Sequence, residues 1–459
     1  MTAAHPGTVI EALADYAATE GERSLPADVR HHAKRALIDW FAALLPGAQL
    51  PPATLLAAAL ADEFGVTGGA VVYGTGRRAP LRTAALINAT ASHIIEFDDI
   101  FRDAIYHPGC PVIGAALAAA QTCGADGVAL LRAIVIGYEV STRIGVAVQP
   151  SHYRYWHTTG TIGTFGAAAA TAALLGLDAT RFAHALATAA TMAAGLQQAF
   201  RSDAMSKPLH AGHAAEAGAL AALAASRGVT GALDVLEGEA GFGAAMSRGA
   251  AWAHAVDDLG RRYNICAMTF KNHGCCGHAF AAIDAALALR PDLDLDAIEA
   301  VTIGTYRTAL DVTDRRAVAT PFEGRFSTPF TVASALVHGS VRLDAVSPER
   351  LADPRVQALM RRVTMVVDPE CEAAFPARRS AVVTITLADG RQLTQRQPTR
   401  KGDPDAPLTD DELADKFREL ASPAVGDAAA RDLLATLRTL DTASAGVVAR
   451  LGLGPPGPE

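Results

Sequence analysis

The chain has 459 residues, of which half are hydrophobic and only 6% aromatic, and its formal net charge is −8. This length exceeds what a single hydrophobic core usually serves, so two or three domains are expected. The acidic balance and the lack of a run of basic residues argue against a nucleic-acid partner. The longest apolar run, residues 165–177, is too short to span a bilayer, so no membrane partner is expected either.

The start of the chain and its cysteines point to one cellular compartment. The N-terminal MTAAHPGTVIEAL lacks the basic start and apolar centre of a signal peptide. The six cysteines show no disulfide framework, and Cys275 and Cys276 are adjacent. Reduced thiols are typical of the cytosol. We therefore expect a cytoplasmic protein.

The first 260 residues carry the pattern of helices. Thr8 and Glu11 have the spacing of a capping box that opens a first helix. Glycines recur within the later segments, where they permit neighbouring helices to approach closely. Apolar residues recur at helical spacing in six further segments, which are 29–45, 55–64, 130–146, 161–175, 179–199 and 211–226. An all-helical domain is therefore predicted over residues 1–267.

One glycine-rich run interrupts these helices. Residues Gly74 to Ala79 read G-x-G-x-x-A after a short strand-like segment, and Glu96 follows at about the spacing of the acid in a dinucleotide-binding fingerprint. Helical segments lie on both sides, however, and no second strand follows to complete a βαβ unit. The sequence favours a tight turn between helices, with dinucleotide binding as an alternative.

The pattern changes after residue 267. Segments 297–305, 362–367 and 381–387 alternate and are rich in β-branched residues, and Ala388-Asp389-Gly390 is a hairpin turn signal. Segments 328–336 and 348–360 look helical, so a smaller α+β domain is predicted over 268–400. Helical sequence returns from Thr409 to Leu451, and we expect residues 401–459 to pack back on the helical domain. The predicted fold class is mainly α.

A charged break separates two apolar helical segments between residues 88 and 121. It contains a histidine that can carry a proton near neutral pH, followed by Pro-Gly and with few lysines nearby. This composition indicates an active-site loop, with an ordinary polar loop as the alternative. The charged residues, all within twelve positions, are Glu96, Asp98, Asp99, Arg102, Asp103 and His107.

Further polar patches lie around His157, in segment 206–213, in segment 271–278 and at Tyr306-Arg307. His157 could instead be a core histidine satisfied by the fold, and Lys207 a solvated lysine. Residues 273–278 offer zinc-type ligands in the order H-x-C-C-x-H, which is not a common zinc spacing, so we expect no metal.

The residue types favour a reaction in which a side chain removes or returns a proton. The chain has neither the G-x-S-x-G elbow of hydrolases nor a phosphate-binding loop. What remains is a set of histidines, lysines and acids without an obvious cofactor. A histidine can remove a carbon-bound proton beside a carboxylate, and nearby donors can stabilise the resulting enediolate.

Four motifs in collinear order resemble the MmgE/PrpD family. They are HIIEFDD…HPGCPVIGAALAAA, WHTTGTIGTFGAAAATAALLGL, SKPLHAGHAAEAGALAA and FKNHGCCGHAFAAIDAAL. The family includes 2-methylcitrate dehydratase, cis-aconitate decarboxylase and iminodisuccinate epimerase. The resemblance implies a large helical domain built from both ends of the chain, a smaller α+β lid domain, a homodimer, and no metal or organic cofactor.

The resemblance also implies roles for single residues. It assigns His107, His157 and Lys207 to the pocket, with Lys271 lining it from the lid side. Glu96 replaces an aspartate of the decarboxylases and Ile100 a threonine, which argues against cis-aconitate decarboxylase. We predict catalytic roles for His107, His157, Lys207, Asp98 and Glu96, and substrate-binding roles for Lys271, His210, His278, Tyr306 and Asp99.

The sequence thus predicts a cofactor-independent lyase of the 2-methylcitrate dehydratase type acting on a small anionic di- or tricarboxylic acid. His107 or His157 would take the proton, while the other histidine, or a protonated acid between Glu96 and Asp99, would protonate the leaving hydroxyl. We expect His107, His157 and Lys207 around one cleft between the two domains. An epimerase of a dicarboxylic acid is the nearest alternative, then a decarboxylase, and a non-catalytic helical scaffold is the least favoured.

Overall fold

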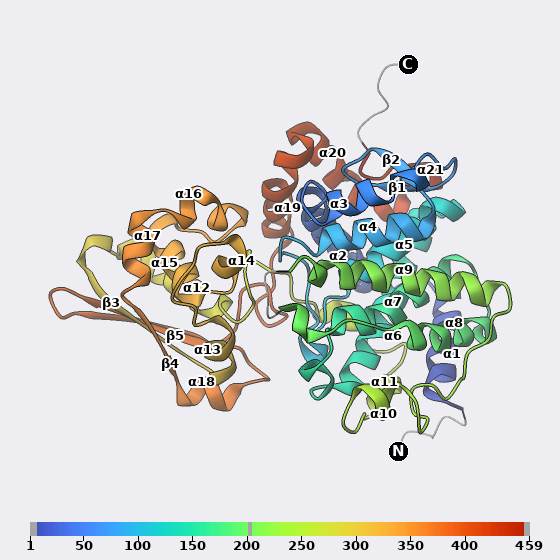
Figure 1. Cartoon of the computed structure of the whole chain (residues 1–459), viewed down its shortest axis with the longest axis horizontal. Helices are drawn as coiled ribbons and strands as arrows, with labels where there is room; N and C mark the ends of the chain where they lie inside the picture. Colours follow the sequence, from blue (N-terminus) through green and yellow to red (C-terminus); the bar gives the residue numbers. More distant parts are fainter. Residues whose placement is uncertain (1–6, 201–203, 454–459) are drawn as a thin grey trace. The chain divides into compact units, whose positions relative to one another are not determined.

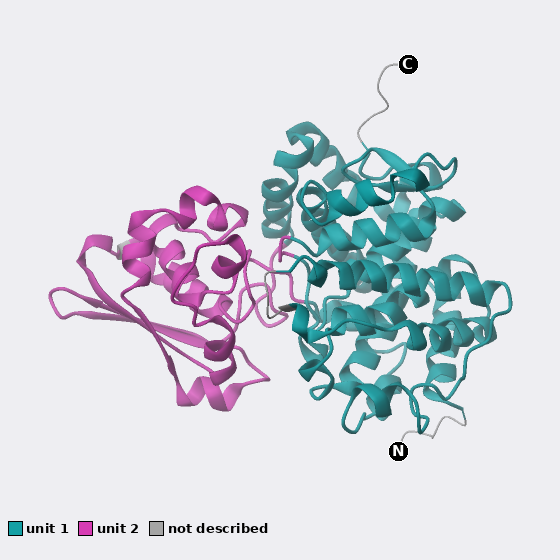
Figure 2. Cartoon of the chain, viewed as in Figure 1, with its two compact units in different colours: residues 1–94, 98–268, 410–459 teal, residues 95–97, 269–409 magenta. Residues whose placement is uncertain are grey.

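The computed structural model describes residues 7–200 and 204–453. The chain divides into two compact units (Figure 2). Unit 1 comprises residues 1–94, 98–268 and 410–459, and unit 2 comprises residues 95–97 and 269–409. Unit 1 is helical apart from one small hairpin, and unit 2 combines a sheet with helices. The predicted mainly-α fold class is confirmed.

Unit 1 is built around α7, which is buried along nearly its whole length and packs against α5, α6 and α9 (Figure 1). Small residues make this packing close, since a Cβ on Gly218 of α9 would lie 2.4 Å from the Thr164 carbonyl oxygen of α7. The helices of unit 1 are α1 Val9–Glu22, α2 Ala27–Gly47, α3 Ala53–Ala59, α4 Leu81–Ser92, α5 Gly109–Cys123, α6 Gly127–Val148, α7 Thr158–Leu174, α8 Ala179–Met192, α9 Ser206–Ser226, α10 Phe242–Met246, α11 Ala253–Val256, α19 Asp410–Val425, α20 Asp427–Arg438 and α21 Ala445–Ala449.

Both ends of the chain contribute to unit 1. The predicted capping box opens α1, with Thr8 accepting from the Glu11 amide and Glu11 accepting from the Thr8 amide. Near the other end of the chain, α19 packs on α2. Lys416 of α19 donates to Asp39 of α2 at 2.6 Å, and both side chains are buried. This ion pair links helices that lie more than 370 residues apart in sequence.

The glycine-rich run near residue 74 forms a β-hairpin rather than a simple turn between helices. Strands β1 (Ala70–Val72) and β2 (Arg77–Ala79) pair antiparallel. Gly74 and Gly76 lie between them with φ of 82° and 66°, in the left-handed region that glycine adopts without strain. Since a dinucleotide fingerprint requires a parallel βαβ unit, these glycines serve the hairpin instead.

Unit 2 contains a four-stranded sheet in the order β4-β3-β5-β6. Strand β3 (Ile298–Thr305) runs parallel to β4 (Val363–Val367) and antiparallel to β5 (Ala381–Leu387). The predicted hairpin at Gly390 joins β5 to β6 (Gln392–Gln397), where side chains on one face are exposed.

Helices supply the rest of the unit 2 core. Phe280 of α12 and Phe330 of α15 are fully buried among apolar side chains of β3 and β5. The helix predicted over 348–360 is broken in two, because Pro354 starts a new helix that Asp353 caps. The helices of unit 2 are α12 Phe280–Leu289, α13 Arg307–Thr313, α14 Pro321–Arg325, α15 Thr328–His338, α16 Pro348–Leu351, α17 Pro354–Met360 and α18 Pro369–Ala374.

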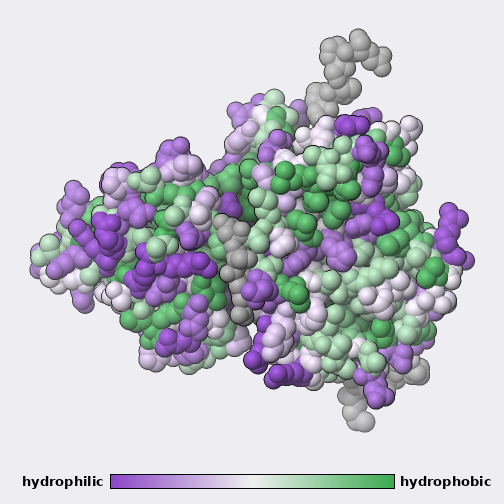
Figure 3. All heavy atoms as spheres, in the orientation of Figure 1, coloured by the Kyte–Doolittle hydropathy of each residue, from purple (hydrophilic) through white to green (hydrophobic). Residues whose placement is uncertain are grey.

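The two units differ in the hydropathy of their visible surfaces. Figure 3 shows hydrophilic side chains over much of the visible surface of unit 2 and many apolar residues on the visible face of unit 1. Among the residues described, none of the helices combines the length and apolar character needed to cross a membrane.

Candidate active site

The charged break between α4 and α5 folds into a short closed loop. After α4 the chain passes His93, and before α5 it passes His107 and Pro108. Phe101 and Tyr106 form an isolated antiparallel bridge, and Ile105 turns the chain with φ of 49°. This closure brings the end of α4 and the beginning of α5 to the same carboxylate.

That carboxylate belongs to Asp98. Its Oδ2 lies 2.7 Å from Nδ1 of His93 and 3.0 Å from Nδ1 of His107, and it accepts a hydrogen bond from the Cys110 thiol at 3.2 Å. The side chain of His107 is 18% exposed, whereas that of His93 is fully buried. For His93 this contact is a hydrogen bond, whereas for His107 it is an ion-pair contact. A carboxylate so close to an imidazole stabilises its protonated form, so His107 is placed to take up a proton.

Asp99 has a different environment from its neighbour. Its Oδ1 accepts from the backbone N–H of Gly109 at 2.9 Å, and its Oδ2 accepts from the Tyr138 hydroxyl at 2.7 Å. Burial, assisted by the nearby Asp39, raises the pKa of Asp99 to about 8. Both oxygens of Asp99 are thus bonded at the start of α5, and its predicted substrate-binding role stays a prediction.

A second pair of histidines, His157 and His210, lies next to His93. His157 precedes α7, and its ring stacks on that of His93 with centroids 5.4 Å apart. Its Nδ1 lies 3.0 Å from Nδ1 of His210 on α9. Burial, followed by the charges of His93 and Lys207, lowers the pKa of His157 well below its ordinary value, and burial lowers the pKa of His210 to about 4. Both rings are neutral at pH 7, so one of the facing nitrogens donates and the other accepts.

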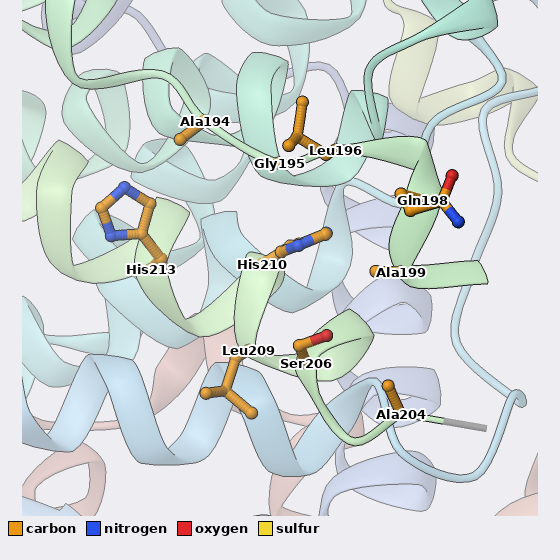
Figure 4. Close-up of a pocket in the computed structure, with 10 residues that line it drawn as sticks. All are labelled: Ala194, Gly195, Leu196, Gln198, Ala199, Ala204, Ser206, Leu209, His210 and His213. Carbon is orange, nitrogen blue, oxygen red and sulfur yellow. The ribbon is translucent and has the colours of Figure 1, made fainter. Parts of the chain in front are cut away.

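A pocket of about 560 Å³ adjoins this pair. In Figure 4 the ring of His210 lies between the segment of Gly195 and Leu196 and the start of α9. The His157 amide donates to the Gly195 carbonyl at 2.9 Å, which fixes the pocket wall to the start of α7. Lys207 is partly buried in the first turn of α9. The pocket is lined by Ala194, Gly195, Leu196, Gln198, Ala199, Ala204, Ser206, Leu209, His210 and His213.

Glu96 and Lys271 pair within unit 2. Nζ of Lys271 lies 3.2 Å from Oε2 of Glu96, and both residues are buried. Glu96 has φ of 61°, a left-handed conformation that is rare for a residue of this size and that is found mostly at functional sites. The charge of Glu96 also acts on the partly buried Arg325.

The remaining predicted residues of unit 2 form separate contacts. His278 Nδ1 lies 2.7 Å from the Tyr306 hydroxyl, and Tyr306 stacks on Phe375. Burial lowers the pKa of His278 and raises that of Tyr306 to about 12. His273 instead bonds Asp284 through Nε2 at 2.8 Å. The two histidines of the H-x-C-C-x-H segment therefore have different partners.

The predicted site residues thus fall into distinct groups. Unit 1 brings Asp98 to His107 and His157 to His210, with Lys207 acting electrostatically on both of the latter rings. The sequence argument missed His93, which joins the two pairs, although it lies within the HIIEFDD motif. It ends an apolar helical segment, and its five-residue spacing from Asp98 is the one signal in the sequence that could have indicated this contact.

Comparisons with known proteins cover most of the chain. The model of the MmgE/PrpD N-terminal domain matches residues 11–255, and that of the C-terminal domain matches residues 273–442. The chain is 27% identical over 466 residues to the cis-aconitate decarboxylase-like protein oryM of Aspergillus oryzae, with 95% of each chain covered. It is 29% identical over 401 residues to cis-aconitate decarboxylase of Homo sapiens, covering 83% of this chain and 81% of the relative. It is 33% identical to 2-methylcitrate dehydratase of Cupriavidus necator over 128 residues, or 26% of each chain.

Proposed function

Because the chain belongs to the MmgE/PrpD family, we propose that it is a lyase acting on a small di- or tricarboxylic acid through removal of a proton beside a carboxylate. The relatives support the lyase class, since they are named as decarboxylases and a dehydratase. Dehydration of a hydroxylated acid of the 2-methylcitrate type is our first candidate. The homodimer and the cytoplasmic location stay predictions from the sequence.

The observation that carries this proposal is the contact between Asp98 and His107. The carboxylate lies 3.0 Å from Nδ1 of His107, and Nε2 of this partly exposed ring is the nitrogen proposed to accept the proton. The developing imidazolium is then stabilised by the adjacent carboxylate. In this proposal His107 is the base and Asp98 a positioning residue.

The second proton step differs from the sequence-based expectation. His157 is neutral, and Asp99, which its raised pKa of about 8 keeps protonated near pH 7, has both oxygens bonded to Gly109 and Tyr138. We propose instead that protonated His107 returns its proton to the leaving hydroxyl, which departs as water. The proton taken from carbon thereby balances the reaction, and the electron pair of the C–H bond forms the new double bond.

Cations are proposed to bind the carboxylates of the substrate. Lys207 is the cation beside His157 and His210, and its ammonium would neutralise a carboxylate that these neutral rings also contact. Lys271 is retained as a second carboxylate-binding residue on the resemblance of its FKNHGCC motif, with Glu96 fixing its ammonium. His278 and Tyr306 are retained as a polar substrate-binding pair.

Decarboxylation of cis-aconitate is the second candidate. The observation that favours it is the length of the alignments, since a relative named cis-aconitate decarboxylase aligns with 83% of this chain and one named cis-aconitate decarboxylase-like aligns with 95%. Loss of CO₂ would leave the electron pair of the broken C–C bond on carbon, and His107, protonated beforehand by solvent, would donate its proton to that carbon and then be reprotonated by solvent. Glu96 and Ile100, which replace the aspartate and threonine expected of decarboxylases, keep this reaction second.

The test is a substrate screen in D₂O followed by NMR. Wild-type protein is incubated with 2-methylcitrate, cis-aconitate and aspartate-derived acids. Loss of water from 2-methylcitrate supports the first candidate, and loss of CO₂ from cis-aconitate supports the second. Deuterium entering an otherwise unchanged acid would favour an epimerase, and no change in any acid would contradict the proposal. The exposed His254 supplies a matched control, since His254→Gln should behave as wild type while His107→Gln should not.

A further inference from the structure

We propose that His93, Asp98 and Cys110 form a binding site for a transition-metal ion of the zinc class. The three side chains come from the end of α4, the following loop and the first turn of α5. One ligand-type atom from each residue lies within 4.8 Å of the other two.

The distances between the three ligand atoms fit an ion of the size of Zn²⁺. Asp98 Oδ2 lies 2.7 Å from His93 Nδ1 and 3.2 Å from Cys110 Sγ, and the sulfur lies 3.8 Å from the same nitrogen. An ion placed between three atoms so spaced is about 2 Å from each of them, which matches zinc–nitrogen and zinc–oxygen bonds, while the sulfur would move outward by a few tenths of an ångström to reach a zinc–sulfur bond of about 2.3 Å. The site therefore needs only small side-chain adjustments to bind an ion.

The ligand types select the metal. An imidazole, a carboxylate and a thiolate suit Zn²⁺ and its neighbours in the transition series, whereas Mg²⁺ and Ca²⁺ prefer oxygen ligands alone. His107 faces the same carboxylate oxygen at 3.0 Å and is the candidate for a fourth ligand, with water as the alternative. Binding replaces the thiol proton of Cys110, which is released to solvent as the sulfur–metal bond forms.

The site is largely ordered before any ion arrives. His93, Asp98 and Cys110 are at most 2% exposed. The ring of His93 lies between those of His107 and His157, at centroid distances of 5.1 and 5.4 Å. Because these side chains are already held in place, binding costs little conformational entropy. Access is from the side of His107, the most exposed member of the cluster.

Metal binding has a consequence for activity that rests on the proposed function. An ion on Asp98 withdraws the carboxylate that holds His107, so Zn²⁺ should inhibit turnover. The binding itself does not depend on the proposed function, and the two are tested by separate readouts.

The experiment uses the full chain after treatment with a chelator. Co²⁺ is added as a spectroscopic probe for a cysteine ligand, and Zn²⁺ is titrated by calorimetry. We expect one ion per chain, a thiolate-to-cobalt charge-transfer band and release of protons on Zn²⁺ binding. Cys110→Ser should abolish the band and weaken Zn²⁺ binding by at least about 100-fold, since even residues that only support metal ligands cost 10- to 100-fold when lost.

Two other cysteines provide controls. Cys123, at the opposite end of the same helix, is exposed, and Cys276 is a partly buried thiol of unit 2. Cys123→Ser and Cys276→Ser should leave the band unchanged. Absence of the band in wild type, or its persistence in Cys110→Ser, overturns the proposal. Circular dichroism checks that each variant folds, and His93→Gln, which should also lose the tight Zn²⁺ site, provides a second test. If the wild-type protein shows the cobalt band but is inactive on every acid, the metal site is supported and the proposed lyase function is rejected.

Discussion

Two buried histidines five residues apart have very different surroundings. His152 has both ring nitrogens engaged by groups that do not titrate, with Thr161 Oγ1 at 2.7 Å and the Met246 carbonyl at 3.0 Å. The ring of His157 instead contacts those of His93 and His210. Burial lowers the pKa of both His152 and His157. Burial and a lowered pKa therefore do not by themselves identify a catalytic histidine, whereas the chemistry of its partners does.

The comparison predicts that substitutions around Asp98 and His157 lower activity, whereas substitution of His152 lowers stability. The largest effect is expected from Asp98→Asn, because a neutral amide cannot stabilise the imidazolium that forms on His107. We expect kcat to fall by about 10²- to 10⁴-fold, the usual contribution of general acid–base catalysis, with a smaller change in KM. Steady-state kinetics on the acid identified by NMR provide the measurement. A kcat within about threefold of wild type would remove Asp98 from the mechanism.

Lys271→Met tests the buried pair of unit 2. Removing one partner leaves the Glu96 charge buried without its ammonium, which typically costs about 3–5 kcal/mol of stability. Adding Glu96→Gln should recover part of this loss. Lys34→Met is the control, because its pair with Asp441 is partly exposed and should contribute less than about 1 kcal/mol. Denaturant unfolding measures all four proteins, and equal losses for the two lysines would contradict the account.

His152 should make stability depend on pH. Its pKa is about 4 in the fold, against about 6.5 when unfolded, because burial disfavours the charged ring. Between these values the unfolded chain binds a proton that the folded chain does not, so the free energy of unfolding falls as pH drops from 6.5 to 4. The full difference is roughly 3 kcal/mol. His152→Gln should flatten this part of the stability profile, and an unchanged slope would show that His152 does not carry it.

Lys207→Ala should have the smallest of these effects. Loss of a charge-assisted bond to a carboxylate costs roughly 1.5–3 kcal/mol, or about 10- to 100-fold in kcat/KM. Substrate should also raise the melting temperature of the variant less than that of wild type. Arg227→Ala, an exposed cation just beyond the other end of α9, is the matched control. Wild-type turnover together with a wild-type ligand shift would reject the carboxylate-binding role.

Much of the fold could be predicted from the sequence, because its signals are local. The family resemblance and the mainly-α class are confirmed, and Asp389-Gly390 correctly marked the β5–β6 hairpin. Helix ends were less accurate. We expected α9 only from Ala211, but it begins at Ser206, because Pro208 lies in the first turn, where a missing N–H leaves no intrahelical bond unmade.

The arrangement of the site could be predicted only in part, because it depends on contacts between distant segments. The motif supplied His107 and Asp98, but nothing local indicated that Asp99 would bond Tyr138, which lies 39 residues further along the chain. The left-handed backbone of Glu96 and the contact between His157 and His210 likewise arise from tertiary packing. The catalytic roles themselves stay predictions.

The exchange of the substrate's carbon-bound proton in D₂O tests the central claim most directly. His107→Gln and the exposed control His254→Gln are compared with wild type on the acid identified by NMR. If His107 is the base, the variant loses exchange and turnover together by about 10²- to 10⁴-fold, while its melting temperature stays close to that of wild type. Exchange in His107→Gln at a rate near that of wild type would contradict the account.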